Sequence, residues 1–326
     1  MSVRSVLVLA NPYSGSGPNH KRVGRLEAAL QDAGLDARVV WSLEERDGRL
    51  RALDAETSCV VAAGGDGSIA DVVNQMDAAG RLGVPFATLP VGNENLFAQE
   101  FGFGLAPGPM VGAIRGGRTR AVDLARLRVE PGGCESDYTA KAEVDGRLLT
   151  LMASAGLDAE VIRRLDRWRK NLPDGRVRRV RRITYLPKII GSVLGYRYPA
   201  IELVADGRAV RGHQAYVFNL PRYGGGFDFA PDARADDGRL SWVVFRDPGL
   251  LRLLGYHLKV IRRTHLSSDR VAHGRAERVS LRSVGGRPAP VQADGDPAGP
   301  TPLAVEVLPG ALNVIDVTPT TGPGAG

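Results

Sequence analysis

The residues best suited to chemistry lie in a glycine-rich turn, Gly64–Ser68, where one carboxylate, Asp66, stands among three glycines. The apolar run before it, Cys59–Ala63, predicts a buried strand, and Ser68 is expected to cap the following helix. A strand, a glycine turn and a helix start can bind phosphate, because glycines admit an anion and the helix N-terminus offers free N–H groups. Asp66 would repel a bare phosphate, so we expect it to face Mg²⁺, a metal-bound water or a ribose hydroxyl.

The alternative is an ordinary strand-to-helix turn that happens to be rich in glycine. Asp-Gly pairs occur at seven places in this chain, and most of them are expected to be simple turns. The flanking elements must therefore decide between the two interpretations.

The first part of the chain alternates strand-like and helix-like segments. Strands are predicted at Ser5–Ala10, Asp36–Trp41 and Pro85–Leu89, and apolar periodicity predicts helices at Lys21–Ala33 and Leu50–Ala55. This alternation indicates a doubly wound parallel α/β sheet, in which ligands bind beyond the carboxyl ends of the strands. The polar turns at those ends are Asn11–Gly17, Gly64–Ser68 and Pro90–Asn95.

After Asp123 the pattern changes to short strands and hairpin signals, which predicts a mainly antiparallel β-structure with a few helices. We expect domains at 1–124 and 125–318, with a last strand that could return to the first domain, and a disordered tail at 319–326. The predicted segments of the second half are the strands Ala142–Val144, Leu148–Ala153, Ile201–Ala205, Ala209–Val210, Leu240–Phe245, Val279–Leu281 and Pro302–Leu308, and the helix Pro248–Arg263.

Size and composition fit two hydrophobic cores, since the chain has 326 residues of which 43% are apolar. No apolar run approaches the roughly 18–20 residues that a membrane span needs. Met1–Ala10 is predicted to be a first strand, not a secretory signal, and Cys59 and Cys134 suggest no disulfide or thiolate metal site. A cytoplasmic enzyme is the default expectation.

The net charge of +7 favours anionic partners and is concentrated in the segment Arg163–Arg182, with nine arginines, one lysine and two aspartates. Apolar residues at helical spacing accompany these cations, which predicts peripheral contact with an anionic membrane. A solvated helix face packed on the core is the alternative. No nucleic-acid fold signature is present, so nucleic-acid binding is not expected, and a homodimer is possible.

Six segments, in order, resemble the diacylglycerol kinase catalytic-domain family, which includes sphingosine, ceramide and bacterial lipid kinases. The resemblance spans roughly residues 5–317. The segments are Asn11–Gly15 (N-P-x-S-G), Gly64–Asn74 (G-G-D-G-T-x-x-E-V-x-N), Leu89–Phe97 (L-P-x-G-T-x-N-D-F), Arg120–Leu124 (R-x-x-D-L), Tyr223–Gly226 with Pro231–Ala233 and Asp237–Gly238 (Y-G-G-G…P-x-A…D-G), and Val291–Asp296 (V-Q-x-D-G-E).

The resemblance implies a nucleotide-binding α/β domain, a β-sandwich domain, and transfer of the ATP γ-phosphate to a lipid hydroxyl with Mg²⁺. Ser42 is assigned to the nucleotide site because the family has a threonine near the corresponding position, and a plain helix cap is the alternative. The residues expected to bind the nucleotide are Asn11, Pro12, Tyr13, Ser14, Gly15, Ser42, Gly64, Gly65, Asp66, Gly67, Ser68, Asp71, Asn93 and Asn95.

Two further sites follow from the same comparison. The resemblance implies a structural Mg²⁺ held by Asp237 and the carbonyls of Arg234 and Arg239, with a hairpin turn as the alternative. Asp294 and Asp296 straddle one glycine, which in extended chain puts both carboxylates on one face. We expect one of them near the metal and one, Asp296 by preference, as the general base, together with Asp66 in the catalytic set. A solvated Asp-Gly turn is the alternative here too.

The chain departs from the family at five positions, with Ser68, Asp71, Asn93, Leu96 and Asp296 in place of threonine, glutamate, threonine, aspartate and glutamate. Of these five residues only Leu96 is apolar, so any polar role of that position is lost. The leading interpretation is an ATP-dependent lipid kinase acting on a diacylglycerol-like or sphingoid alcohol. The alternatives are an NAD kinase, which shares the G-G-D-G turn, and a non-catalytic nucleotide- or lipid-binding relative.

Overall fold

The computed structural model describes residues 4–15, 19–130, 145–170, 198–285 and 287–318. The chain forms two compact units: unit 1 is Met1–Asp123 with Gly310–Gly326, and unit 2 is Leu124–Pro309. The predicted strand Ala142–Val144 and the predicted tail 319–326 lie outside the described residues.

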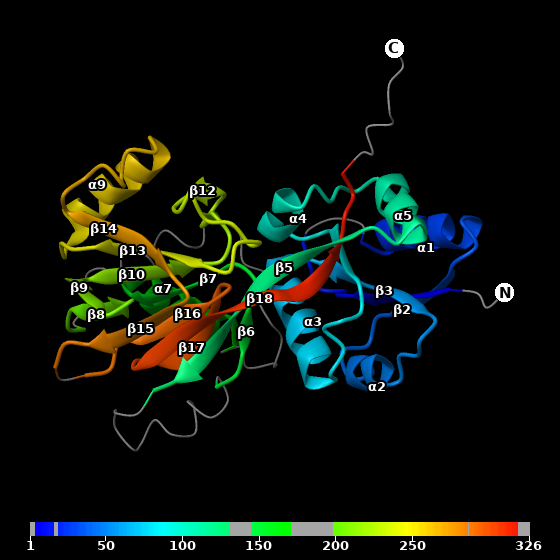
Figure 1. The fold of residues 1–326 in the computed structure, drawn as a ribbon, viewed down its shortest axis with the longest axis horizontal. Coiled ribbons are helices and arrows are strands. Elements are labelled where there is room, and N and C mark those ends of the chain that lie inside the picture. The colour runs from blue at the N-terminus through cyan, green and yellow to red at the C-terminus, as the bar shows by residue number, and fades with distance from the viewer. Residues whose placement is uncertain (1–3, 16–18, 131–144, 171–197, 286, 319–326) are drawn as a thin grey trace, which may run out of the picture. The chain divides into compact units, whose positions relative to one another are not determined.

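Unit 1 is a parallel sheet with helices on both faces. Its strand order is β2-β1-β3-β4-β18, and each neighbouring pair is parallel. Figure 1 shows α1 and α5 on one face and α2 and α3 on the other. Its elements are β1 (Ser5–Ala10), α1 (Asn19–Asp32), β2 (Asp36–Val40), α2 (Arg46–Arg51), β3 (Thr57–Gly64), α3 (Asp66–Ala78), β4 (Phe86–Pro90), α4 (Leu96–Glu100), α5 (Pro107–Gly116), the start of β5 (Thr119–Val129) and the end of β18 (Leu303–Ile315).

The central strands are apolar along their whole length because helices cover both faces. Every residue of β1 is buried, and so are Cys59–Gly64 of β3. In α1 only one stripe is buried, with Val23, Leu26 and Leu30 against the sheet. The doubly wound α/β prediction is therefore confirmed.

Unit 2 is built from two antiparallel sheets. One has the order β18-β15-β8-β9, and β5 and β6 pair beside it; the other has the order β14-β13-β10-β7-β16-β17. Its elements are β6 (Leu148–Leu149), β7 (Met152–Gly156), α7 (Leu157–Lys170), β8 (Ile201–Ala205), β9 (Arg208–Gly212), β10 (Gln214–Phe218), β11 (Arg222–Tyr223), β12 (Phe227–Asp228), β13 (Leu240–Phe245), α9 (Leu250–Ile261), β14 (Val271–Ala276), β15 (Arg278–Ser283), β16 (Pro290–Ala293), β17 (Asp296–Pro300) and the start of β18.

The core of unit 2 draws on both sheets. Leu203 and Leu281 come from the first sheet, and Val217, Trp242 and Val291 come from the second. In β8 buried and half-buried residues alternate, as expected of a strand with one face on the core. The predicted β-sandwich class is confirmed.

Two local predictions were wrong. The second helix covers Arg46–Arg51 instead of Leu50–Ala55. Helix α3 begins at Asp66 with Gly65 as its N-cap, so Ser68 lies inside the first turn and does not cap it. Its hydroxyl is buried and has other partners, described below.

Candidate active site

Three turns of unit 1 meet at the carboxyl ends of neighbouring parallel strands. Asn11–Gly15 follows β1, Gly64–Ser68 begins at the last residue of β3, and Val91–Asn95 follows β4. The Asn11 Nδ2 donates to the Ser68 Oγ at 2.8 Å, and the Ser14 and Ser68 hydroxyls lie 3.1 Å apart. The sheet thus gathers residues that are more than fifty positions apart in the sequence.

The backbones of these turns pack so closely that side chains would not fit. A Cβ on Gly65 would lie 3.1 Å from the Gly92 Cα, and a Cβ on Gly92 would overlap the Gly65 backbone. Gly15 has φ +63°, and a Cβ there would overlap the Val91 carbonyl. By contrast, a Cβ on Gly67 would have nothing within 4 Å. Glycine is therefore required at Gly15 and Gly92, a Cβ at Gly65 would make a tight contact, and one at Gly67 would meet no atom of the chain.

Asp66 links the turn after β3 to the turn after β4. Its carboxylate accepts hydrogen bonds from the backbone N–H groups of Leu96 and Phe97, each at 3.0 Å. A carboxylate at the first turn of α4 satisfies N–H groups that the helix itself leaves unpaired. Asp66 thus has a clear positioning role, and its contact with a metal or a ribose stays a prediction.

Helix α3 points its N-terminus at the same turns. Gly65 is its N-cap in an extended conformation and has no side chain that could accept from the first N–H groups of the helix. Together with the Asn11 and Ser14 side chains, these donors match the chemistry of a phosphate.

The asparagines of the third turn have different surroundings. Asn95 adopts φ +55°, and its amide exchanges two hydrogen bonds with the backbone of Gly92, at 2.9 and 3.1 Å. Asn95 therefore shapes the turn, whereas Asn93 is exposed. Leu96, the apolar departure from the family, is buried at the start of α4.

The remaining predicted nucleotide residues of unit 1 lie at the surface. Tyr13 is exposed, Pro12 is half-buried, and the Ser42 Oγ accepts from the Glu45 N–H at 3.4 Å just before α2. Asp71 is exposed on α3. Burial of the Arg46 guanidinium lowers its pKa, and the negative charge of Asp71 opposes this effect.

In unit 2, the prediction that Asp294 and Asp296 present their carboxylates on one face of extended chain was wrong. Asp294 and Gly295 form the turn of the β16–β17 hairpin, with φ +50° and +88°, so the chain reverses there instead of running extended. The Asp294 side chain is buried and accepts four hydrogen bonds at 2.7–3.0 Å, from the backbone N–H groups of Thr150, Leu151 and Met152 and from the Thr150 hydroxyl. Both of its carboxylate oxygens are engaged in the fold, which gives Asp294 a structural role, and its place in the catalytic set stays a prediction.

Asp296 is the carboxylate that remains accessible. Its side chain is 41% exposed and lies 3.6 Å from the Arg147 Nη2. Arg147 also donates to the carbonyls of Ala293 and Pro297, so it is bound to the hairpin on which Asp296 sits. The two aspartates thus separate into one inside the fold and one at its surface.

Replacing Asp294 by asparagine is expected to destabilise the protein by about 2–5 kcal/mol. An amide NH₂ would face donors where a carboxylate now accepts, which leaves buried N–H groups unpaired. The left-handed backbone itself tolerates asparagine. Chemical denaturation measures the effect, and an Asp294→Asn protein with unchanged stability would contradict the structural role.

A polar cluster that sequence reasoning missed surrounds Asp158 at the start of α7. Its carboxylate accepts from the Ser154 hydroxyl at 2.6 Å, the Tyr223 hydroxyl at 3.1 Å and the Gln292 amide at 3.1 Å. Burial raises the pKa of Asp158. The Gln292 Oε1 accepts from the Gly295 N–H at 2.9 Å, which connects the cluster to the turn before Asp296. The signal was present, since Tyr223 and Gln292 belong to two of the family-like segments.

The metal site predicted at Arg234, Asp237 and Arg239 stays a prediction, and its carboxylate already has a cationic partner in the chain. The Asp237 carboxylate is bonded to the Arg275 guanidinium and accepts from the Arg239 N–H at 3.2 Å. The guanidinium thus already neutralises the charge of Asp237. Among the described residues, no group of three or more histidine, cysteine or acidic side chains is placed to hold a metal.

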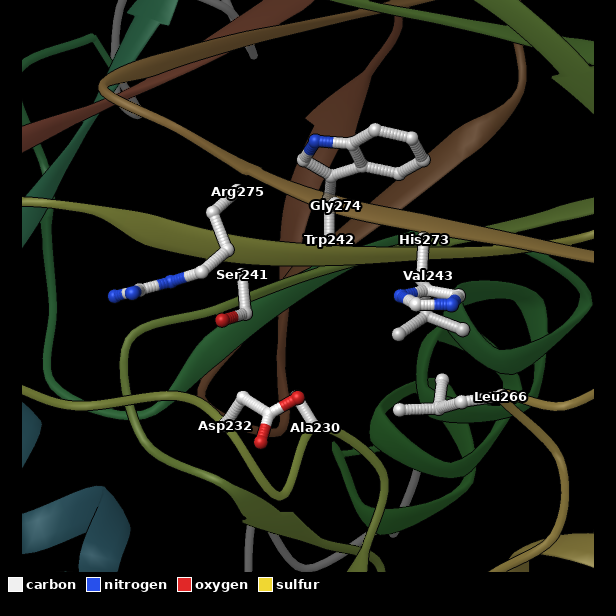
Figure 2. A pocket seen from close by; sticks show the side chains of 9 residues that line it. All are labelled: Ala230, Asp232, Ser241, Trp242, Val243, Leu266, His273, Gly274 and Arg275. Carbon is white, nitrogen blue, oxygen red and sulfur yellow. The ribbon is translucent and has the colours of Figure 1, made fainter.

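Beside this pair lies a cavity of about 40 Å³, shown in Figure 2, which has room for about one water molecule and not for a nucleotide or lipid. Ser241 of β13 and Arg275 of β14 lie on one side of it, with Asp232 across from Ser241. Its lining is completed by Ala230, Trp242, Val243, Leu266, His273 and Gly274.

Thermal unfolding should therefore not respond to metal removal. We expect the Tm to change by less than about 1 °C between EDTA and millimolar Mg²⁺ without nucleotide, because a ligand stabilises only the state that binds it. A rise in Tm with Mg²⁺ that disappears in Asp237→Asn would contradict this and restore the site at Arg234, Asp237 and Arg239.

The described part of the arginine segment supports the alternative of a helix packed on the core. In α7, Val161 and Leu165 are buried, and the buried Glu160 pairs with Arg163 at 2.7 Å and Arg164 at 2.6 Å. The apolar stripe of this helix is thus covered by unit 2 itself. The rest of the segment, residues 171–182, lies outside the described residues.

Two family models match the chain. The diacylglycerol kinase catalytic domain matches residues 5–127, and the YegS C-terminal NAD kinase beta sandwich-like domain matches residues 152–316, about half of the chain. The chain therefore belongs to the diacylglycerol kinase catalytic-domain family, as its motifs indicated.

The relatives are similar over most of their length. A diacylglycerol kinase of Mycobacterium tuberculosis strain H37Rv is 28% identical over 96% of this chain and 95% of its own. One from Bacillus subtilis is 23% identical, covering 84% of each. A crystal structure of a diacylglycerol kinase from Bacillus anthracis has a TM-score of 0.65 at 15% identity, covering 99% of this chain and 100% of its own, which shows the shared fold.

Proposed function

We propose that this chain is an ATP-dependent lipid kinase, which transfers the γ-phosphoryl group of ATP to the hydroxyl of a diacylglycerol-like or sphingoid membrane lipid. The observation that carries the proposal is the meeting of three turns in unit 1, at Asn11–Gly15, Gly64–Ser68 and Val91–Asn95. Family membership supports a kinase acting on lipid.

The phosphates would be held by the residues that the three turns present. The side-chain amide of Asn11, the hydroxyls of Ser14 and Ser68, and the first N–H groups of α3 are donors suited to phosphate oxygens. Mg²⁺, when bound with the nucleotide, would supply charge neutralisation. Asn93 remains as the exposed amide of the third turn for a further nucleotide contact.

Asp296 is the residue we assign as general base. The acceptor hydroxyl forms the new bond to phosphorus, the bond between the γ-phosphorus and the bridging oxygen of ADP breaks, and the hydroxyl proton passes to the carboxylate. Asp296 has the exposure this requires, whereas Asp294 lacks it.

A competition between acceptors tests the proposal. Radiolabelled ATP is incubated with vesicles containing diacylglycerol and a sphingoid base, and NAD⁺ is added to the same reaction. We expect label in the lipid fraction. Label in NADP⁺ would identify an NAD kinase instead, and nucleotide binding without transfer to any acceptor would identify a non-catalytic relative.

A further inference from the structure

Helix α9 presents an apolar stripe to solvent along its whole length. The exposed fractions of Leu251, Leu254, Leu258 and Ile261 are 84%, 57%, 46% and 57%. At about 100° per residue these positions fall on one face of the helix, and at about 1.5 Å per residue the stripe is about 15 Å long. Isolated exposed leucines are ordinary, but a continuous row on one helix marks an interaction surface.

The opposite face of α9 holds the helix to unit 2. Tyr256 and Val260 are buried, and the Tyr256 ring packs on Phe245 with centroids 4.6 Å apart. The Tyr256 hydroxyl donates to Asp247 at 2.9 Å, and Arg270 pairs with the same carboxylate at 3.0 Å. The helix is thus anchored by one side and leaves the other side apolar and uncovered.

The charges around the stripe indicate its partner. The segment 250–268 contains no acidic residue, and its cations are Arg252, Lys259, Arg262 and Arg263. Two nearby acids are engaged, since Asp247 pairs with Arg270 and Arg252, and Asp228 of β12 pairs with Arg263 at 2.5 Å; Asp269 follows the segment and is exposed. Lys259 and Arg262 are exposed beside the stripe.

An apolar stripe with basic neighbours and no acid is the composition of a helix that lies in the headgroup region of an anionic bilayer. The adjacent strand β12 contacts α9 and carries a further exposed ring, Phe227, at 39%. We propose that α9 docks this protein on anionic membrane surfaces, with Leu251, Leu254, Leu258 and Ile261 inserted among the lipid headgroups. The proposal rests on the proposed function only in that a lipid acceptor resides in the bilayer.

The test measures binding without nucleotide or turnover. The full chain is sedimented with vesicles of phosphatidylcholine alone and of phosphatidylcholine with about one-third phosphatidylglycerol. Replacing Leu251 and Leu258 together by glutamine should weaken binding to the anionic vesicles by about a hundredfold, since each leucine contributes about a tenfold effect when half-buried in the interface. Replacing Lys259 and Arg262 by glutamine should weaken it by about thirtyfold, at about fivefold per cation.

The matched control replaces two leucines of unit 1 whose exposure is close to that of Leu258, namely Leu43 and Leu105, both at 48%. Leu43→Gln with Leu105→Gln should bind vesicles as wild type does. In a second measurement, Leu254→Trp should show quenching by brominated acyl chains on vesicle binding, while Leu105→Trp should not.

Three outcomes would overturn the proposal: wild-type protein that binds neither vesicle, an α9 variant that binds as wild type does, or an α9 variant that changes a dimer to a monomer without changing vesicle binding. The last would identify a second copy of the chain as the partner. Activity on a water-soluble short-chain alcohol tests the proposed function separately from membrane docking. That reaction needs no docking, so the α9 variants should retain it.

Discussion

Gly92→Ala is expected to lower kcat/KM for ATP by at least about a hundredfold. The new methyl group would overlap the backbone of Gly65, so the turns after β3 and β4 must move apart. A shift near 1 Å among groups that position a reacting phosphate costs about that factor. Nucleotide affinity, measured by calorimetry with a non-hydrolysable ATP analogue, should fall in parallel.

Gly24→Ala is the matched control for this change. It adds the same methyl group at an exposed position of α1, outside the three turns, where no atom lies within 4 Å, and alanine is the better helix former. We expect near wild-type affinity and turnover. Equal losses in the two variants would mean that close packing of the turns is not what holds the phosphates.

Asp296→Asn is expected to lower turnover by about 10²–10⁴-fold, the usual contribution of a general base. Its stability should change by less than about 1 kcal/mol, because an exposed ion pair such as that with Arg147 contributes little. Steady-state kinetics and denaturation of the same preparation give both numbers.

Asp296→Glu adds the methylene that the family residue has. A gain in turnover would mean that the shorter acid impairs the site, and a loss would mean that the hairpin has adapted to it. If Asp296→Asn turns over lipid as the wild type does, the base assignment is wrong.

The elements predicted best from the sequence are those whose local residue pattern matches their burial in the fold. The wholly apolar strands β1 and β3 and the glycine turns after them were predictable because a strand covered on both faces leaves a continuous apolar run. Glycine spacing likewise predicted that the turns bind phosphate, a function that remains proposed. Helix α9 was predicted from its periodicity, but the exposure of its apolar stripe was not, since periodicity does not show what covers a face.

The failures came from backbone reversals and long-range contacts. The extended backbone predicted for Asp294–Asp296 was wrong because Asp-Gly favours a two-residue turn with positive φ. The pairing of Asp237 with Arg275 joins residues thirty-eight positions apart, and that of Asp66 with α4 joins residues thirty apart. Such contacts leave no local signature in one sequence.

The most direct measurement is transfer of label from ATP to lipid under two labelling schemes. With diacylglycerol in anionic vesicles, ATP labelled at the γ-phosphate should give labelled phospholipid, and ATP labelled at the α-phosphate should give none. Gly24→Ala should retain this transfer and Gly92→Ala should lose it. No labelled lipid from γ-labelled ATP with any long-chain alcohol, under conditions where the protein binds the nucleotide, would contradict the assignment as a lipid kinase.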